Sequence, residues 1–280
     1  MKIQLLSDLH LEANWAWQAQ AAPEADLLVL AGDIGSYQAG TRLSDVNFGL
    51  TRFSPRYGWP CPVIFVPGNH EYDGLDFEQA HDLMQTACER LGIIWLERQV
   101  SIWRKTDKQP VRIIGTTLWT DFDAFAPRPI QGRGANQDKR KSALSARDKA
   151  FRAANHYLRK TGTRLRGEAM LAEQVRAQGL LCQTWLAHAL QEPFDGKTVV
   201  VTHFAPSLQS ADPRYGLTPG TAGFCNTLDH LMPLASHWLH GHLHTANHYR
   251  HQGCEVLANP LGFASKGEQD RFNPLMCINI

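Results

Sequence analysis

The segment KIQLLSDLH, residues 2–10, decides the fold, because its apolar run ends abruptly in Asp8 and His10. A short apolar run bounded by polar residues is typical of a buried strand. The same arrangement recurs in four later apolar runs that end in polar residues, at residues 26–31, 62–67, 198–202 and 236–240. Polar side chains that follow successive strands can converge on one edge of a sheet, where α/β proteins commonly bind ligands.

Helical and extended patterns alternate around these runs. Apolar residues recur at helical spacing over residues 75–91, which predicts a helix there. Further extended segments are predicted at 93–97, 99–103 and 110–119, with a polar turn at 105–109 between the last two. A C-terminal meander of strands is predicted from residue 246 onward. We therefore expect mixed sheets with helices outside them.

The segment of about residues 121–193 differs in character from the rest. It begins with an irregular stretch that contains Pro127, Pro129, Gly132 and Gly134, and then becomes helical, with a second helix predicted over residues 168–190. We expect a single domain over residues 1–280 that carries a helical insertion at about 121–193.

The overall composition excludes several classes of protein. With 280 residues and a formal net charge of +1, the chain as a whole has no strong attraction for polyanions. The six cysteines form no CxxC pair, which argues against a zinc ribbon. No apolar run approaches the roughly 20 residues that span a bilayer, and Asp8 interrupts the N-terminal run too early for a signal peptide. We expect a cytoplasmic protein without a membrane partner, and the sequence carries no signal for an oligomeric state.

The residues after the apolar runs have the chemistry of a metal site. In chain order they are Asp8, His10, Asp33, Asn69, His70, His203, His242 and His244. Imidazole and carboxylate ligands together suit divalent transition ions, and one carboxylate can bridge two ions ~3.5–4 Å apart. Taken singly, each block is explained as well as or better by a polar turn or a surface histidine. Their joint occurrence after successive strands favours a metal site.

These blocks carry a resemblance to a known family. D-x-H, G-D, G-N-H-E, a lone H and G-H-x-H occur in the order found in calcineurin-like metallophosphoesterases, and they span the chain from Asp8 to His244. The resemblance implies an α/β (α+β) fold, a four-layer αββα sandwich of two mixed β-sheets flanked by helices. It also implies two divalent metal ions, Mn, Fe, Zn or Ni, with Mn expected to support activity in vitro.

The same resemblance assigns roles to individual residues. The first ion would be held by Asp8, His10 and His244, the second by Asn69, His203 and His242, with Asp33 as the bridge between them. His70 would stand outside the ligands, facing the leaving-group oxygen as general acid or transition-state stabiliser. Glu71 occupies a position where many members have Asp, and it would orient its neighbour. His240 lies outside the motif, and we expect it to orient a ligand, with a substrate contact as the alternative.

The function implied is that of a metal-dependent phosphoesterase. A hydroxide between the two ions would attack the phosphorus of a phosphomonoester or phosphodiester, most simply a small anionic one. Two alternatives stay open: a nuclease acting on DNA or RNA, and a non-catalytic metal-binding scaffold on the same fold. Metal storage would leave His70 without a role.

A basic stretch inside the insertion leaves a further question open. Residues 133–166 contain eleven Lys or Arg and two Asp, a net charge of +9. On a helical wheel Lys141 and Arg152 share one face, and Ala150 and Tyr157 lie roughly opposite. The basic face is either a solvated surface or a grip for an anionic substrate or nucleic acid. Lys141 and Arg152, together with Trp119 after a predicted strand, are therefore candidate substrate contacts.

Overall fold

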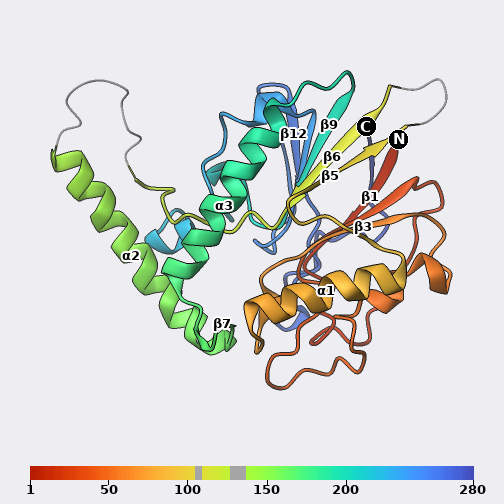
Figure 1. The fold of residues 1–280 in the computed structure, drawn as a ribbon, viewed down its shortest axis with the longest axis horizontal. Coiled ribbons are helices and arrows are strands. Elements are labelled where there is room, and N and C mark those ends of the chain that lie inside the picture. Colours follow the sequence, from red (N-terminus) through yellow and green to blue (C-terminus); the bar gives the residue numbers. More distant parts are fainter. Residues whose placement is uncertain (105–108, 127–136) are drawn as a thin grey trace.

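The chain folds into two mixed β-sheets with helices outside them (Figure 1). The computed structural model describes residues 1–104, 109–126 and 137–280, with backbone alone at 137–140. The irregular stretch predicted around Pro127 to Gly134, and most of the polar turn predicted at residues 105–109, lie outside the described residues.

The first sheet has five strands. In spatial order they are β13 (Cys277–Asn279), β1 (Lys2–Leu6), β2 (Leu27–Ala31), β3 (Val63–Val66) and β4 (Ile94–Trp95). Strands β1, β2, β3 and β4 pair in parallel, and β13 joins β1 antiparallel at the edge. The carboxyl ends of β1, β2 and β3 therefore share one edge of this sheet.

The second sheet has six strands. In spatial order they are β11 (Asn247–His251), β12 (Cys254–Ala258), β10 (His237–His240), β9 (Lys197–Thr202), β6 (Val111–Thr116) and β5 (Gln99–Trp103). Its four central strands are parallel, whereas β11 and β5 pair antiparallel at the two edges. The strands that the sequence predicts are thus present in both sheets.

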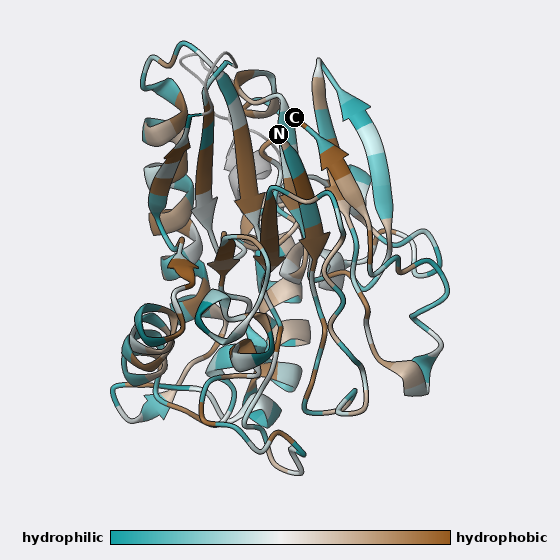
Figure 2. Cartoon of the chain, turned by 90° about the vertical axis from the view of Figure 1, so that its right-hand side faces the viewer, coloured by the Kyte–Doolittle hydropathy of each residue, from teal (hydrophilic) through white to brown (hydrophobic). Residues whose placement is uncertain are grey.

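Side-chain alternation explains why the two sheets pack together. In β2, Leu27, Val29 and Ala31 belong to one buried cluster and Leu28 and Leu30 to another. The first cluster also contains inward residues of β9, so it lies between the sheets, and the second lies under the helices. Burial on both faces is what makes these parallel strands continuously apolar, and Figure 2 shows the hydrophobic residues concentrated in them.

Helices α1 (Phe77–Leu91) and α3 (Ala172–Gln191) form the outer layers. α1 begins after Asp76, whose side chain caps the backbone N–H of Glu78, ends at Gly92 in the left-handed region, and packs beside β4. α3 packs on β6 and buries Cys182 and Leu186. The fold is therefore the predicted αββα sandwich.

The helical pattern predicted over residues 168–190 is wrong at its start. Residues Glu168–Ala169 form strand β8, which pairs with β7 (Arg164–Leu165) in a small hairpin, so the helix begins only at Ala172. Backbone pairing in this hairpin competes with helix formation there.

Helix α2 (Gln137–Thr161) lies outside the sandwich layers (Figure 1). It packs against the 3₁₀ helix η5 (Pro219–Gly223) and against α3. The single domain with a helical insertion at about 121–193 stays a prediction. α3 lies within these predicted boundaries, but it packs on β6 as a layer of the sandwich.

Short 3₁₀ helices connect the remaining elements. They are η1 (Leu50–Phe53), η2 (Pro55–Tyr57), η3 (His70–Tyr72), η4 (Leu208–Ser210), η6 (Met232–Leu234) and η7 (Ala264–Lys266). All six cysteines are free. None of the helices in the described part of the chain has the length and apolar character needed to cross a bilayer.

Candidate metal centre

The predicted ligands come together because the central strands of both sheets are parallel. Asp8 and His10 follow β1, Asp33 follows β2 and Asn69 follows β3 in the first sheet. In the second sheet the corresponding residues follow β9 and β10, namely His203, His242 and His244. All of these residues lie at carboxyl ends of parallel strands, the edge of an α/β sheet where ligands bind.

The first group of donors consists of Asp8, His10, Asp33 and His244, each offering an atom within 4.8 Å of the others. Nε2 of His10 lies 3.0 Å from Nε2 of His244, and Nε2 of His244 lies 3.5 Å from Oδ1 of Asp8. Asp8, His10 and Asp33 are fully buried. This group coincides with the predicted first set and its bridge.

The second group consists of Asp33, His203 and His242, again with donor atoms within 4.8 Å. Nε2 of His203 lies 3.2 Å from Oδ2 of Asp33, 3.1 Å from Oδ1 of Asn69 and 3.2 Å from Nδ1 of His242. Asp33 therefore belongs to both groups.

Most of these residues have an unusual backbone conformation. The φ angles are 52° at Asp8, 44° at His10, 55° at Asp33, 74° at His242 and 48° at His244. Positive φ is uncommon for residues other than glycine, and its cost is tolerated where the surrounding structure holds a functional side chain in place. Five of the eleven non-glycine residues with positive φ in the described part of the chain are thus predicted ligands.

Two glycines of the sequence motifs, Gly68 and Gly241, allow the loops that carry the predicted ligands to approach each other closely. A Cβ atom at Gly68 would collide with the carboxylate and the backbone nitrogen of Asp33. A Cβ atom at Gly241 would collide with the carboxylate of Asp8. Any larger residue would push these carboxylates out of the centre.

Each histidine that faces the centre through Nε2 is fixed by its other ring nitrogen. Nδ1 of His10 lies 2.9 Å from Oε1 of Glu12, and Nδ1 of His244 lies 2.7 Å from Oε2 of Glu268. Nδ1 of His203 lies 2.8 Å from the carbonyl oxygen of Ala31. An acceptor at Nδ1 holds the proton there and leaves the Nε2 lone pair free, the usual arrangement of metal-ligating histidines.

The residues present fit a metal-binding role. Within the described part of the chain, Oδ2 of Asp8, Oδ2 of Asp33 and Nε2 of His242 are buried without a hydrogen-bond partner. Oδ2 of Asp33 lies 3.2 Å from Nε2 of His203 and 3.9 Å from Nε2 of His10, but neither contact has hydrogen-bond geometry. Buried acceptors left unpaired are costly. Cations held by Asp8 and Asp33 would satisfy the two carboxylate oxygens.

The electrostatics of the centre favour an ionised Asp33. Burial by itself would raise the pKa of Asp33, but His203 and His70 outweigh burial and hold it well below its usual value. Burial likewise would lower the pKa of His203, but Asp33 raises it to about 9. For Asp8, burial dominates and raises the pKa. Added positive charge would keep Asp8 ionised as well.

His70 lies beside the donor groups and not in either of them. Its Nδ1 is 2.5 Å from Oδ2 of Asp73, and its Nε2 is 3.1 Å from the hydroxyl of Tyr157 on α2. Burial would lower the pKa of His70, but the carboxylates of Asp33 and Asp73 raise it to about 10. The ring is thus held with Nε2 directed away from its carboxylate partner.

Glu71 and His240 support the backbone around the centre. The Glu71 carboxylate accepts hydrogen bonds from the backbone N–H groups of Asp33, Ile34 and Gly68, at 3.1, 2.6 and 2.7 Å. It therefore ties the loop after β2 to the loop after β3. Buried His240 contacts the hydroxyl of Ser210 and the carbonyl of Gly241, 3.0 Å each. It thus touches the backbone between the strand and His242.

The three candidate substrate contacts lie in different surroundings. Trp119 is buried and lines a cavity that also reaches Asn69 and His242. Lys141 and Arg152 are exposed on α2 and do not line this cavity. A contact of these two side chains with substrate stays a prediction.

Four further residues of the centre lie outside the sequence motifs: Glu12, Asp73, Tyr157 and Glu268. Two of them have a weak sequence signal, because a carboxylate follows His10 by two residues and His70 by three. Tyr157 and Glu268 come from distant segments, and no local pattern points to them.

Comparisons with known proteins bear on the family and the fold. An uncharacterized protein of Acanthamoeba polyphaga mimivirus, L509, is 22% identical over 304 residues that cover 99% of this chain and 96% of that protein. The crystal structure of phosphopantetheinyl hydrolase from Mycobacterium tuberculosis superposes with a TM-score of 0.66 at 20% identity, covering 98% of this chain and 94% of that one. At that identity the likeness shows the fold. The family model for calcineurin-like phosphoesterases matches residues 1–246, and the chain belongs to this family.

Proposed function

We propose that the protein hydrolyses a phosphomonoester or phosphodiester with the help of two divalent metal ions. The observation that carries the proposal is the position of Asp33, whose carboxylate belongs to both donor groups. A shared carboxylate is the arrangement that two-metal hydrolases use. The family membership supports the same class of reaction.

Each ion would have its own set of protein ligands. Asp8, His10 and His244 would hold one, and Asn69, His203 and His242 the other, with Asp33 between them. When bound, the ions would supply a water activated near neutral pH and neutralise charge on the phosphate oxygens. Nitrogen and oxygen ligands of this kind accept Mn, Fe, Zn or Ni, and we propose Mn for reconstitution in vitro.

His70 would act as the general acid. Asp73 fixes its Nδ1, so Nε2 is the nitrogen that can give a proton to a substrate oxygen. Nε2 has an oxygen partner, the hydroxyl of Tyr157 at 3.1 Å, which a substrate oxygen would have to replace. We propose that the leaving-group oxygen takes the proton there.

The substrate would be a small phosphoester. Lys141 and Arg152 lie outside the cavity beside the centre, so no observation specifically favours a nuclease. The relative from Mycobacterium tuberculosis is named for phosphopantetheine, and a phosphopantetheine ester therefore belongs among the substrates to be assayed.

A substrate panel tests the proposal. The metal-free protein is reconstituted with Mn and assayed on p-nitrophenyl phosphate, bis-p-nitrophenyl phosphate and a phosphopantetheine ester, with a chelator control. We expect hydrolysis of at least one ester, abolished by the chelator. Protein that demonstrably binds metal but hydrolyses none of them would support a non-catalytic scaffold instead.

A further inference from the structure

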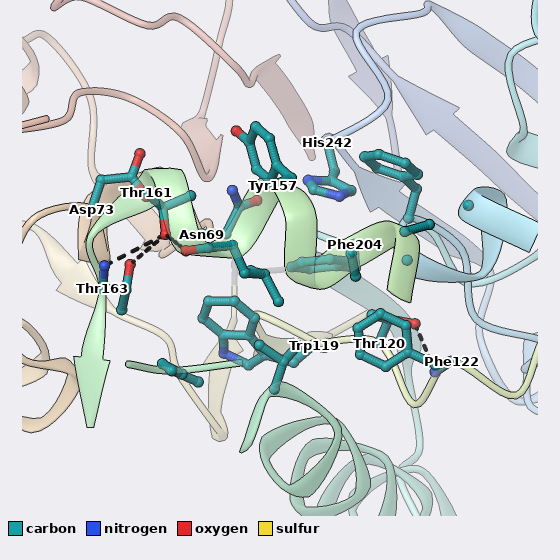
Figure 3. A pocket seen from close by; sticks show the side chains of 18 residues that line it. Asn69, Asp73, Trp119, Thr120, Phe122, Tyr157, Thr161, Thr163, Phe204 and His242 are labelled. Atoms are coloured by element: carbon teal, nitrogen blue, oxygen red, sulfur yellow. Dashed lines mark hydrogen bonds between the residues drawn. The ribbon is translucent and has the colours of Figure 1, made fainter. Parts of the chain in front are cut away.

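A cavity of about 140 Å³ opens beside the metal centre (Figure 3). We call it the apolar cavity, and its main walls are Trp119, Phe122, Ala154, Leu158, Phe204 and Phe224. Figure 3 shows Tyr157 and His242 on one side of it and Trp119 on the other. Helix α2 thus forms one wall with its apolar face, while exposed basic residues such as Arg152 point elsewhere.

The apolar cavity is continuous with the catalytic residues. Asn69 and His242, both proposed metal ligands, form part of its wall. The ring of Phe204 packs on the ring of His242, with centroids 3.9 Å apart. Asp73 and Tyr157, the two partners of His70, also line it. A phosphoester held at the metal centre therefore has this cavity as its neighbour on the side of His70.

The few polar groups in the wall are already engaged. The hydroxyl of Thr120 donates to the carbonyl of Ala222 at 2.6 Å, and that of Thr161 donates to the carbonyl of Leu158 at 2.9 Å. The hydroxyl of Thr163 donates to the carbonyl of Tyr72 at 3.2 Å. Among the described residues no Lys or Arg lines the cavity. It therefore offers no cation for a second phosphate and few hydrogen bonds for a sugar.

We infer that the substrate is a phosphoester whose alcohol carries an uncharged, apolar group, and that this group occupies the apolar cavity. The inference rests on the proposed function and names the substrate class for it. Because His70 would protonate the leaving oxygen, the group on this side is the leaving alcohol. A dry apolar cavity of about 150 Å³ accommodates benzene, so the occupant is a ring or a short branched chain of that size.

A matched pair of substrates tests the inference in the Mn-loaded protein. Cyclohexylmethyl phosphate and glycerol 3-phosphate both release a primary alcohol, but only the first alcohol is apolar. Both are assayed as monoesters or, if the panel reveals a diesterase, as methyl diesters. Burial of each methylene is worth roughly fourfold in affinity, so we expect kcat/KM at least ~30-fold higher for cyclohexylmethyl phosphate.

Two variants in α2 test whether the preference for the apolar ester arises in the apolar cavity. Ala153 lines the cavity at an exposed helix position, so Ala153→Phe should fill the cavity without disturbing the fold. We expect it to lower the ratio of kcat/KM for cyclohexylmethyl phosphate to that for glycerol 3-phosphate at least ~10-fold. His156→Phe, exposed on the same helix and away from the cavity, is the control and should keep the wild-type ratio.

A binding measurement provides a readout that does not depend on activity. Saturation-transfer NMR should detect cyclohexylmethanol on metal-free wild type and on His156→Phe, and the signal should be lost in Ala153→Phe. Equal kcat/KM for the two esters in an active enzyme, or unchanged alcohol binding in Ala153→Phe, would overturn this inference alone. Failure to hydrolyse any ester in the panel would instead overturn the proposed function.

Discussion

The Nε2 atoms of His10 and His244 lie 3.0 Å apart, although 234 residues separate the two histidines in the sequence. The Nδ1 atoms of both rings face carboxylates, those of Glu12 and Glu268. With the protons held at Nδ1, the two Nε2 lone pairs point at the same space and repel each other. A cation bound by both nitrogens would make the arrangement favourable, which is why we propose a metal centre here.

The carboxylate behind His244 should therefore control metal affinity. Glu268→Gln removes the charged acceptor at Nδ1 and should weaken Mn binding by roughly 10- to 100-fold, the usual effect of losing such a partner. Isothermal titration of metal-free protein measures it.

The chain provides a matched control for this variant. Glu255 forms the same kind of pair with His248, at 3.2 Å, but on the exposed surface. Glu255→Gln should leave Mn affinity unchanged. Equal affinities of Glu268→Gln and wild type would show that His244 needs no support and would weaken its assignment as a ligand.

Removal of His70 should separate catalysis from metal binding. Because its nitrogens contact Asp73 and Tyr157 and it belongs to neither donor group, His70→Ala should keep the full metal content. Loss of the proposed general acid should lower kcat by roughly 10²- to 10⁴-fold. Metal analysis together with steady-state kinetics measures both effects. A variant that loses metal would mean that His70 is a ligand.

A single methyl group at Gly68 should disrupt the centre. The Cβ atom of Gly68→Ala would collide with Asp33, so we expect a stability loss of about 1–3 kcal/mol and loss of at least one bound ion. Thermal unfolding and metal content are measured beside Gly220→Ala, whose Cβ meets nothing closer than a Thr218 oxygen at 3.5 Å. Wild-type metal content in Gly68→Ala would show that Asp33 tolerates displacement.

A buried carboxylate away from the proposed ligands should make stability depend on pH. Burial raises the pKa of Glu97, which accepts a 2.5 Å hydrogen bond from the backbone N–H of Thr117. A raised carboxyl pKa means that the folded state holds the proton more tightly. The contribution of Glu97 to stability is therefore greatest below about pH 4.5, the unfolded value, and falls as the pH rises through the folded pKa.

Glu97→Gln removes this dependence, because the amide does not ionise. The Tm of Glu97→Gln minus the Tm of wild type should become more positive from pH 5 to pH 8. Chelator is present throughout to exclude effects of metal binding. A constant Tm difference across this range would mean that Glu97 does not titrate between the folded and unfolded states.

The sequence predicts which side chains lie together at the candidate site, because their positions follow from strand order. Asp33 and His203 each follow a continuously apolar run, and parallel pairing places the ends of such runs on one edge of each sheet. The packing of the two sheets then brings these two edges together. Tyr157 shows where this reasoning stops. Helical periodicity assigns it to the apolar face of α2, but its contact with His70, 87 positions away, depends on how α2 packs. The start of α3 is mispredicted because residues 164–169 form the β7–β8 hairpin, in which Arg164 also bridges to Asp76 before α1. The helical pattern of apolar residues does not reveal this pairing.

The central claim is that one carboxylate serves two ions. Crystals of the Mn-loaded protein, measured at the Mn absorption edge, test it directly. We predict two anomalous peaks ~3.5–4 Å apart with the Asp33 carboxylate between them. A single peak, or two peaks with Asp33 turned away from one of them, would contradict the account.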